Sequence, residues 1–152
     1  ENSITFAKYN PKLRFFLGDV RNFERLSYAC SGVDIIIHAA ALKHVSIAEY
    51  NPMEFVATNI EGSYNVVKAA IANNVKKTIL LSTDKAVNPV NLYGATKLSA
   101  EKIFIASNNT VGNRDCYFSS VRYGNVIASR GSVIEKFLNL NKKKKYCFYN
   151  HR

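Results

Sequence analysis

The amino-acid sequence predicts an α/β fold built around a parallel β-sheet, and three observations support this. Short apolar runs rich in β-branched residues alternate along the chain with longer segments of helical periodicity, an alternation typical of βαβ units. The run at residues 33–40 is almost continuously apolar, like strands that helices cover on both faces. Small or polar residues follow the runs, at the place where ligands bind in such sheets.

The predicted elements follow the order β-α-β-α-β-α-β, with right-handed crossovers. Asn22 is suited to cap the first helix, and Pro52 to stand in the first turn of the second. A turn is expected at residues 113–114. We expect strands at residues 13–17, 33–40, 77–83 and 117–122, and helices at residues 22–29, 51–73, 93–107 and 132–140.

The composition indicates an ordinary globular domain, with 47% hydrophobic and 21% charged residues among 152. No apolar run approaches the ~20 residues that cross a bilayer, and the first residues show no signal-peptide pattern. We therefore expect a cytoplasmic protein without a membrane partner. Because Glu1 stands in place of Met, we expect the sequence to begin partway through a longer protein.

The positive charge is concentrated at one end of the sequence. Residues 142–152 contain five basic residues and no acid, so the first 141 residues carry only half of the net charge of +10. Because the lysine run is terminal and lacks interleaved arginines, we expect a solvated tail and no nucleic-acid partner. The mildly basic remainder suits a phosphate-bearing substrate. The predicted organisation is a partial domain at residues 1–141 and a divergent basic tail at residues 142–152.

The three cysteines, Cys30, Cys116 and Cys147, are odd in number and widely spaced. This spacing matches neither a disulfide framework nor a metal site. We expect reduced thiols, no bound metal, and a core position for Cys30.

The strongest local signal is Tyr93-Gly94-Ala95-Thr96-Lys97. A tyrosine and a lysine four residues apart share one helix face. A nearby ammonium favours the phenolate, whose ordinary pKa of about 10 makes tyrosine a poor base at neutral pH. Such a tyrosine can remove a hydroxyl proton while hydride leaves the same carbon. The spacing alone is weak, because a solvated helix face often carries the same pair.

The surrounding residues favour the catalytic interpretation. Ser82 and Thr83 end a predicted buried strand about ten residues before Tyr93, where their hydroxyls can bond a reacting oxygen. Three alanines follow the preceding strand: Ala39, Ala40 and Ala41. Their small side chains would let a flat cofactor approach the backbone. Tight helix–sheet packing explains the alanines equally well. With residues 123–126 (Tyr-Gly-Asn-Val), these features resemble the extended short-chain dehydrogenase/reductase superfamily.

A closer resemblance rests on five segments, at residues 17–21, 38–45, 82–86, 91–97 and 122–126. Together they are similar to the inverting UDP-N-acetylglucosamine 4,6-dehydratases of the polysaccharide-biosynthesis group. Long membrane-anchored relatives usually have Met at the position of Tyr93, which points to the short soluble type that makes precursors of pseudaminic-acid-like sugars. The resemblance implies a Rossmann-like, doubly wound sheet, UDP-N-acetylglucosamine as substrate and a homo-oligomer, hexameric in relatives.

The resemblance also implies a reaction and its residues. The sugar is oxidised at C4, loses water across C5 and C6, and regains the hydride at C6. Tyr93, with Lys97 and Thr83, serves C4; Lys85 removes the C5 proton; and Asp84 protonates the leaving hydroxyl. An adjacent acid and base suit an elimination. From the residues alone, a surface ion pair between Asp84 and Lys85 is equally open.

The resemblance implies further contacts to a nicotinamide cofactor, NADP with NAD as the alternative. Asp19 is expected to bond the adenine, with Val20 beside it. Asn59 is implied to order the cofactor or a water near the lysine, and a polar residue on the helix surface is an equally open interpretation. The remaining implied cofactor contacts are Ala39, Ala40, Ala41, Ser82, Tyr93 and Lys97. For the substrate, Asn125 is implied to contact the nucleotide sugar, and Lys43 and Arg130 to meet phosphate. Asp19 is equally suited to a turn, and Lys43 and Arg130 to a solvated surface.

Two departures from the family pattern limit these expectations. The Gly-rich loop that holds the pyrophosphate of a Rossmann cofactor is absent, and so is most of the C-terminal substrate region. Glu135 stands where relatives usually have Pro, and residues 146–152 match nothing expected. We therefore expect these 152 residues alone to bind cofactor poorly and to be inactive.

Two alternative functions stay open. A UDP-N-acetylhexosamine 4-epimerase of the same superfamily would share Tyr93 and Lys97 but would not need Asp84 and Lys85 for elimination. A non-catalytic binding domain on a Rossmann-like scaffold is the other alternative, because a fold does not dictate a function. Two neighbouring proton-transfer pairs in one predicted cleft argue against the second.

Overall fold

The architecture was analysed in a computed structural model that describes residues 13–126. The chain divides into two units after Arg122, so residues 123–126 are treated by themselves. The predicted helix at residues 132–140 and the predicted boundary at residue 141 lie outside the described residues.

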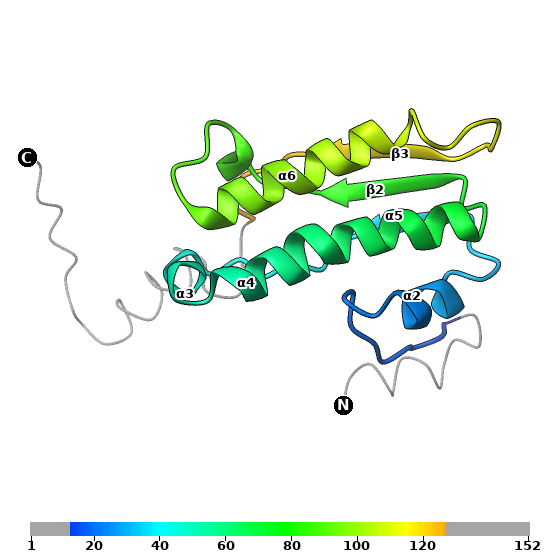
Figure 1. Cartoon of the computed structure of the whole chain (residues 1–152), viewed down its shortest axis with the longest axis horizontal. Helices are drawn as coiled ribbons and strands as arrows, with labels where there is room; N and C mark the ends of the chain where they lie inside the picture. Colours follow the sequence, from blue (N-terminus) through cyan, green and yellow to red (C-terminus); the bar gives the residue numbers. More distant parts are fainter. Residues whose placement is uncertain (1–12, 127–152) are drawn as a thin grey trace, which may run out of the picture. The chain divides into compact units, whose positions relative to one another are not determined.

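A parallel three-stranded sheet forms the centre of the first unit (Figure 1). Its strands are β1 (Ile35–His38), β2 (Lys77–Leu81) and β3 (Tyr117–Val121), in the order β1-β2-β3. Ile37 pairs with Ile79, and Ile79 with Ser119, so the three carboxyl ends lie at one edge. The predicted α/β class, the parallel pairing and these three strands are confirmed.

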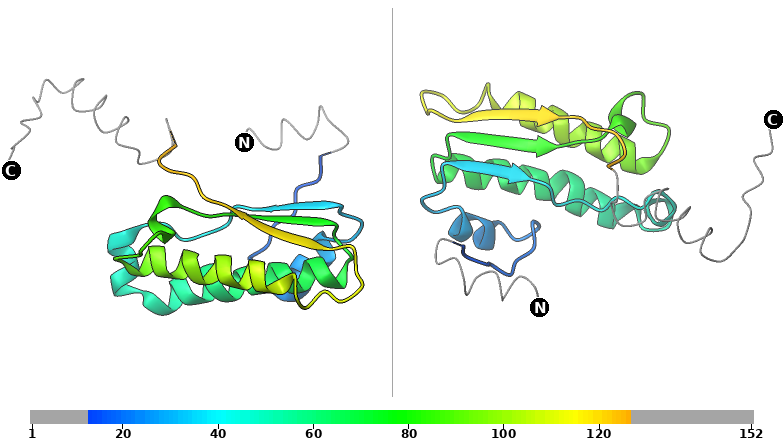
Figure 2. Two further views of the ribbon diagram at one scale, coloured as in Figure 1. Left: turned by 90° about the horizontal axis from the view of Figure 1, so that it is seen from above. Right: turned by 180° about the vertical axis from the view of Figure 1, so that it is seen from behind.

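Helices cover only one face of this sheet in the described part of the chain (Figure 2). Helices α5 (Gly62–Ala72) and α6 (Leu92–Ser107) lie against that face, where Leu80, Val67 and Phe104 form the core. On the opposite face Ile35 and Ile37 are 56% and 64% exposed. Among residues 13–126 no helix packs on that face, so the coverage on both faces that we expect from residues 33–40 is seen on one face only in this part of the chain.

The predicted strand at residues 13–17 is also wrong. A strand requires a hydrogen-bonded neighbour, and no ladder includes these residues in the described structure. Their groups instead engage helix α2 (Phe23–Ala29). The Leu17 carbonyl accepts a hydrogen bond from Arg25 Nε at 2.8 Å, and the Arg25 guanidinium lies 5.3 Å from the centre of the Phe16 ring. The predicted cap of α2 is confirmed, because Asn22 Oδ1 accepts from Arg25 N.

The predicted helix over residues 51–73 is confirmed in extent but is not regular. It consists of α4 (Pro52–Phe55), a π-helical segment η1 (Val56–Glu61) and α5. A further short helix, α3 (Val45–Tyr50), precedes it and was not predicted. The 3-10 turn η2 (Asp84–Ala86) lies between β2 and α6. Because π-helical segments occur frequently at functional sites, η1 is a landmark for the site below.

Candidate functional site

The candidate site lies where β2 ends and α6 begins. Asn91 caps α6, since its Oδ1 accepts a hydrogen bond from Gly94 N at 2.8 Å. One turn apart on this helix, Tyr93 is half-buried and Lys97 is only 3% exposed. The predicted tyrosine and lysine therefore occupy the first turns of one helix, against the carboxyl end of the sheet.

The Lys97 ammonium is buried and bonded to the sheet. Its Nζ donates to the Leu81 carbonyl at 2.7 Å. Burial lowers the pKa of Lys97 to about 8, while the charge of Glu101 acts in the opposite direction. The charge of Lys97 is therefore close to titration at neutral pH, unlike that of an exposed lysine.

A carboxylate one turn further along α6 is held by an arginine at the end of β3. Arg122 donates to Glu101 through Nε and Nη2, at 2.7 to 3.1 Å. Burial is the largest single influence and acts to raise the pKa of Glu101, but the hydrogen bond and charge of Arg122, together with Ser82 and the charge of Lys97, outweigh it and the pKa is lowered. The nearby Ser82 hydroxyl also lowers the pKa of Glu101, although Ser82 Oγ makes no hydrogen bond of good geometry to any described residue.

Asp84 and Lys85 form a half-exposed ion pair beside Tyr93. Lys85 Nζ lies 3.1 Å from Asp84 Oδ1, and Thr83 Oγ1 donates to the same oxygen at 2.9 Å. The Lys85 hydrogen bond, followed by that of Thr83, lowers the pKa of Asp84. In this state the carboxylate is ionised, so the surface ion pair that the sequence left open is present.

Gly94 allows the turn that carries Asp84 and Lys85 to approach α6 closely. A Cβ at residue 94 would overlap the Lys85 carbonyl oxygen and would lie 3.0 Å from Pro89 Cβ. The backbone that carries Asp84 and Lys85 therefore packs directly on the helix turn that carries Tyr93. Sequence reasoning missed this contact, because a glycine after a tyrosine is not distinctive.

Asn59, in the π-helical segment η1, connects that segment to the loop after β1 and to α6. It is buried, and its side chain bonds both the NH and the carbonyl of Leu42, at 2.8 and 2.9 Å. Its Nδ2 also donates to Thr96 Oγ1, which in turn donates to the Tyr93 carbonyl. Asn59 thus connects the loop after β1 to the first turns of α6, which carry Tyr93 and Thr96.

His38 is the last residue of β1, and it is connected to Asn59 through Ser63. Ser63 Oγ donates to the Asn59 carbonyl at 2.6 Å, so it accepts from His38 Nε2 at 3.1 Å. The imidazole also stacks on Phe104. Burial, and then the charge of Lys97, lower the pKa of His38 to about 4. His38 is therefore neutral at physiological pH and carries its proton on Nε2.

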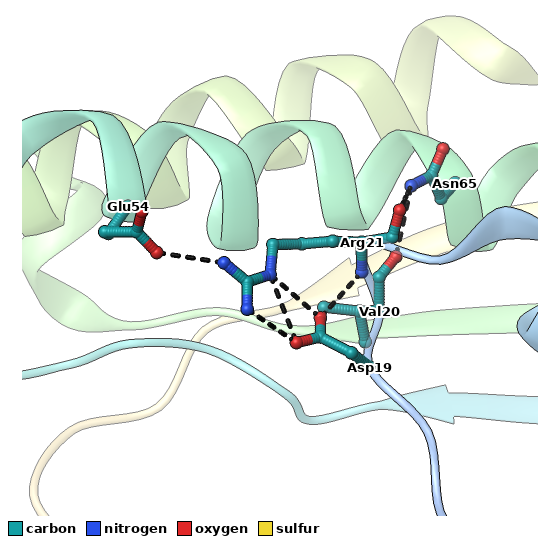
Figure 3. A network of polar contacts seen from close by, with 5 residues as sticks. All are labelled: Asp19, Val20, Arg21, Glu54 and Asn65. Atoms are coloured by element: carbon teal, nitrogen blue, oxygen red, sulfur yellow. Dashed lines mark hydrogen bonds and ion pairs between the residues drawn. The ribbon is translucent and has the colours of Figure 1, made fainter.

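The predicted adenine contacts lie in a separate network, shown in Figure 3. Arg21 pairs with Asp19 at 2.8 Å and with Glu54 at 2.9 Å. Asn65 Nδ2 donates to the Val20 and Arg21 carbonyls. The Arg21 side chain lowers the pKa of Asp19. Asp19 is thus half-exposed and ionised, and it serves as a turn and ion-pair residue in this structure.

The other predicted ligand residues lie in loops after strands. In the loop after β1, Ala39, Ala40 and Lys43 are exposed and Ala41 is half-buried. Asn125 is exposed in the second unit, and Arg130 lies outside the described residues. The alanine side chains at 39–41 are short and leave room beside the backbone. At the same edge of the sheet, Lys97 contributes a buried ammonium, and Ser82 a buried hydroxyl that has no hydrogen-bond partner among the described residues. These residues fit a nicotinamide cofactor.

Three further features of the described residues concern other kinds of site. Among residues 13–126, no group of three His, Cys, Asp or Glu side chains is arranged to hold a metal ion. Within the same part of the chain, none of the helices has both the length and the apolarity to cross a membrane. A hollow of about 620 Å³ between residues 13–16 and 28–33 contains none of the predicted site residues.

Comparison with known families agrees with this geometry. The model of the family described as polysaccharide biosynthesis protein matches residues 1–147. The chain belongs to this family.

Curated relatives in this comparison include two kinds of sugar-nucleotide enzyme. A UDP-N-acetylglucosamine 4,6-dehydratase (inverting) from Campylobacter jejuni is 61% identical over 130 residues, which are 86% of this chain and 39% of that protein. A UDP-glucose 4-epimerase from Rickettsia canadensis is 48% identical over 145 residues, or 95% of this chain and 42% of that protein. The chain thus spans about two fifths of the length of these relatives. The resemblance to inverting dehydratases is confirmed.

Solved structures support the Rossmann-like fold. Pen from Bacillus thuringiensis superposes with a TM-score of 0.88 at 45% identity, over 94% of this chain and 46% of that one. The dTDP-glucose 4,6-dehydratase DesIV from Streptomyces venezuelae, bound to NAD, gives a TM-score of 0.78 over 93% of this chain and 48% of that one. At 23% identity the second likeness concerns the fold alone.

Proposed function

We propose that the complete protein containing this chain is a UDP-N-acetylglucosamine 4,6-dehydratase that inverts C5. The observation that carries the proposal is the Asp84–Lys85 pair, whose backbone packs on Gly94 beside Tyr93. A hydroxyl base and an elimination pair at one sheet edge suit a reaction that oxidises C4 and then removes water across C5 and C6. The 61% identity to the Campylobacter jejuni enzyme supports the same assignment.

The protein is proposed to use NADP, with NAD as the alternative. When bound, this cofactor supplies the acceptor and donor of hydride. The backbone of residues 39–41 is accessible for it, and Lys97 and Ser82 offer polar groups at the sheet edge. Asn59, Asp19 and Val20 complete the proposed cofactor contacts. For the substrate, Lys43, Asn125 and Arg130 are proposed to bind the nucleotide.

The chain's own residues then move protons. Tyr93 accepts the proton of the C4 hydroxyl, and the Lys97 charge stabilises the phenolate that must exist before this transfer. Thr83 is proposed to bond the C4 oxygen when substrate is bound, in place of its hydrogen bond to Asp84. Lys85 takes the proton from C5, which a neighbouring carbonyl at C4 acidifies, and Asp84 gives a proton to the departing C6 hydroxyl.

The ion pair in the structure corresponds to the protonation state after elimination. Lys85 then holds the proton taken from C5, and Asp84 has lost its own. The 3.1 Å contact between Lys85 Nζ and Asp84 Oδ1 is a path by which one proton returns from the amine to the carboxylate. That transfer runs against the ion pairing that lowers the pKa of Asp84, and it restores the neutral amine and the protonated acid for the next turnover. After hydride returns to C6, C5 regains a proton, and this is balanced by the proton that Tyr93 took from the C4 hydroxyl.

A 4-epimerase is the second candidate, favoured by the 48% identity to the Rickettsia canadensis protein. It would use Tyr93 and Lys97 for C4 and leave the Asp84–Lys85 pair without a role in the chemistry. The two candidates therefore differ in what Lys85 does.

The deciding experiment incubates the complete gene product with UDP-N-acetylglucosamine and NADP, with NAD in parallel, and follows the products by mass spectrometry. A product lighter by one water, with inverted C5 by NMR, supports the dehydratase. A new isomer of unchanged mass supports the epimerase. If neither product forms, the result would favour a non-catalytic domain or a different sugar nucleotide as substrate.

The Lys85→Ala variant tests the elimination step directly. Because Lys85 is the proposed base at C5, loss of its amine should reduce formation of the dehydrated product by at least about 100-fold, while hydrogen exchange or oxidation at C4 persists. Lys76→Ala is the matched control, since Lys76 also pairs with an aspartate, Asp34, at the opposite end of β2. Equal dehydration by both variants would contradict the assignment.

The cellular setting is proposed on the same basis. The product would serve surface polysaccharide or flagellin glycans, including pseudaminic-acid precursors, and the enzyme would act in the cytoplasm as a homo-oligomer, hexameric as in relatives. We expect the 152 residues alone to be inactive, because they contain no Gly-rich phosphate loop.

A further inference from the structure

Helix α6 carries three ionisable groups on successive turns. Tyr93, Lys97 and Glu101 are spaced four residues apart, so they form a row along one side of the helix. The first two have roles in the proposed function, whereas Glu101 has none. Its carboxylate is nevertheless buried, with 9% of the side chain exposed, and a buried carboxylate is costly unless charged partners compensate it.

Arg122 supplies that compensation from the last residue of the first unit. Two of its nitrogens bond both carboxylate oxygens of Glu101, at 2.7 to 3.1 Å. The arginine side chain is 44% exposed, so its own charge remains largely in water. The pair therefore fixes a negative charge on the buried side of α6, one turn beyond Lys97.

The charge of Lys97 helps to lower the pKa of His38 of β1, which is neutral at physiological pH and so places no charge beside Lys97. The Leu81 carbonyl of β2 accepts its hydrogen bond. Charged groups on other elements packed against α6 are exposed or engaged with different partners: Glu49, Glu54, Glu61, Lys68, Asp84 and Lys85. Among residues 13–122, Glu101 is thus the negative charge that opposes the desolvation of Lys97.

We propose that Glu101, held by Arg122, is a positioning residue that keeps Lys97 charged and in place beside Tyr93. This inference rests on the proposed function insofar as Lys97 assists Tyr93 in oxidation at C4. Both the dehydratase and the epimerase begin with that step, so the role of Glu101 is the same for each.

The proposal predicts opposite effects from the two members of the pair. Glu101→Gln keeps the shape but removes the negative charge, so the pKa of Lys97 should fall by about one unit. Arg122→Gln removes the counter-ion and leaves the carboxylate, so the pKa of Lys97 should rise. A merely structural pair would give the same defect, reduced stability, from either change.

The experiment labels lysine Cε with ¹³C in the complete gene product, without substrate, and follows its shift from pH 6 to 10. The Lys97 signal is assigned by its loss in Lys97→Met. We expect a wild-type midpoint near 8, a lower one in Glu101→Gln, and a higher one in Arg122→Gln. Glu61→Gln, which removes an exposed carboxylate on η1, is the control for net charge and should match wild type.

A second measurement connects the charge to catalysis. In Glu101→Gln the alkaline limb of the kcat profile, which reports Lys97, should move to lower pH, and the acidic limb, which reports Tyr93, to higher pH, with KM unchanged. Unchanged Lys97 midpoints in both variants would overturn the proposal. The titration needs no substrate, so a failed dehydration assay together with shifted midpoints would reject the proposed function and leave the role of Glu101 standing.

Discussion

His38 shows how burial changes the behaviour of a single side chain. Its imidazole is 4% exposed and has a pKa of about 4, compared with 6.5 for an ordinary histidine. Between these values the unfolded chain binds a proton that the folded chain does not. The free energy of unfolding should therefore fall as the pH is lowered from about 6.5 to 4, by about 3 kcal/mol in total.

Urea unfolding of the chain at pH 7, 6 and 5 measures this dependence. His38→Gln should flatten it, whereas His44→Gln, an exposed neighbour, should leave the slope unchanged. Lys97 is protonated in both states throughout this range, and the carboxylates with lowered pKa act mainly below about pH 4.5. A slope that survives in His38→Gln would show that another group is responsible.

Residues whose partners lie close in sequence could be predicted, and those with distant partners could not. Tyr93 and Lys97 are one helical turn apart, so periodicity alone places them on one face. Asn59 bonds Thr96 across 37 positions, and Arg122 bonds Glu101 across 21. No local pattern encodes such pairings. A Glu four residues after Lys97 was the one available signal for Glu101.

At the scale of elements, the contact between η2 and α6 depends on Gly94. A methyl group at residue 94 would overlap the Lys85 carbonyl oxygen, so Gly94→Ala should displace the turn and cost about 1–3 kcal/mol of stability. Thermal unfolding measures the cost. Gly124→Ala is the control, because nothing lies within 4 Å of the added Cβ, and its stability should stay within about 0.5 kcal/mol of wild type.

Activity adds a second criterion for the same variant. Displacement of η2 moves Lys85 and Asp84 but leaves Tyr93 and Lys97 on α6. Gly94→Ala should therefore lose dehydration more than C4 oxidation. A variant with wild-type stability and product distribution would show that the two elements do not require this close contact.

The elements themselves were predictable to different degrees. The strand predicted at residues 77–83 and the helix predicted at residues 93–107 are both present, as β2 and α6. The segment at 13–17 has a strand-like composition but pairs instead with side chains of α2, which a propensity cannot anticipate. The π-helical form of residues 56–61 was equally hidden, because its side-chain pattern differs little from that of an α-helix.

At the scale of the whole described structure, the two faces of the sheet should respond differently to mutation. Leu80 is fully buried on the helix-covered face, whereas Ile35 on the neighbouring strand is 56% exposed. Leu80→Ala should cost about 2–5 kcal/mol, and Ile35→Ala less than about 0.5 kcal/mol. Urea unfolding of the 152-residue chain measures both.

The same pair of variants reveals whether the open face is covered in solution. If Ile35→Ala costs as much as Leu80→Ala, another part of the chain or a second copy packs on β1. A dependence of the Ile35→Ala cost on protein concentration would then distinguish a second copy, because association is concentration-dependent and intramolecular packing is not.

The π-helical segment has a consequence for how this region can change during evolution. A π-helical segment closes i→i+5 hydrogen bonds and so holds one residue more than an α-helix of the same length. Deletion of one residue between 56 and 61 would therefore convert the segment to regular α-helix and leave the orientation of α5 unchanged. Asn59, however, would lose its place against the Leu42 backbone and Thr96, so the extra residue of η1 should be inherited together with Asn59.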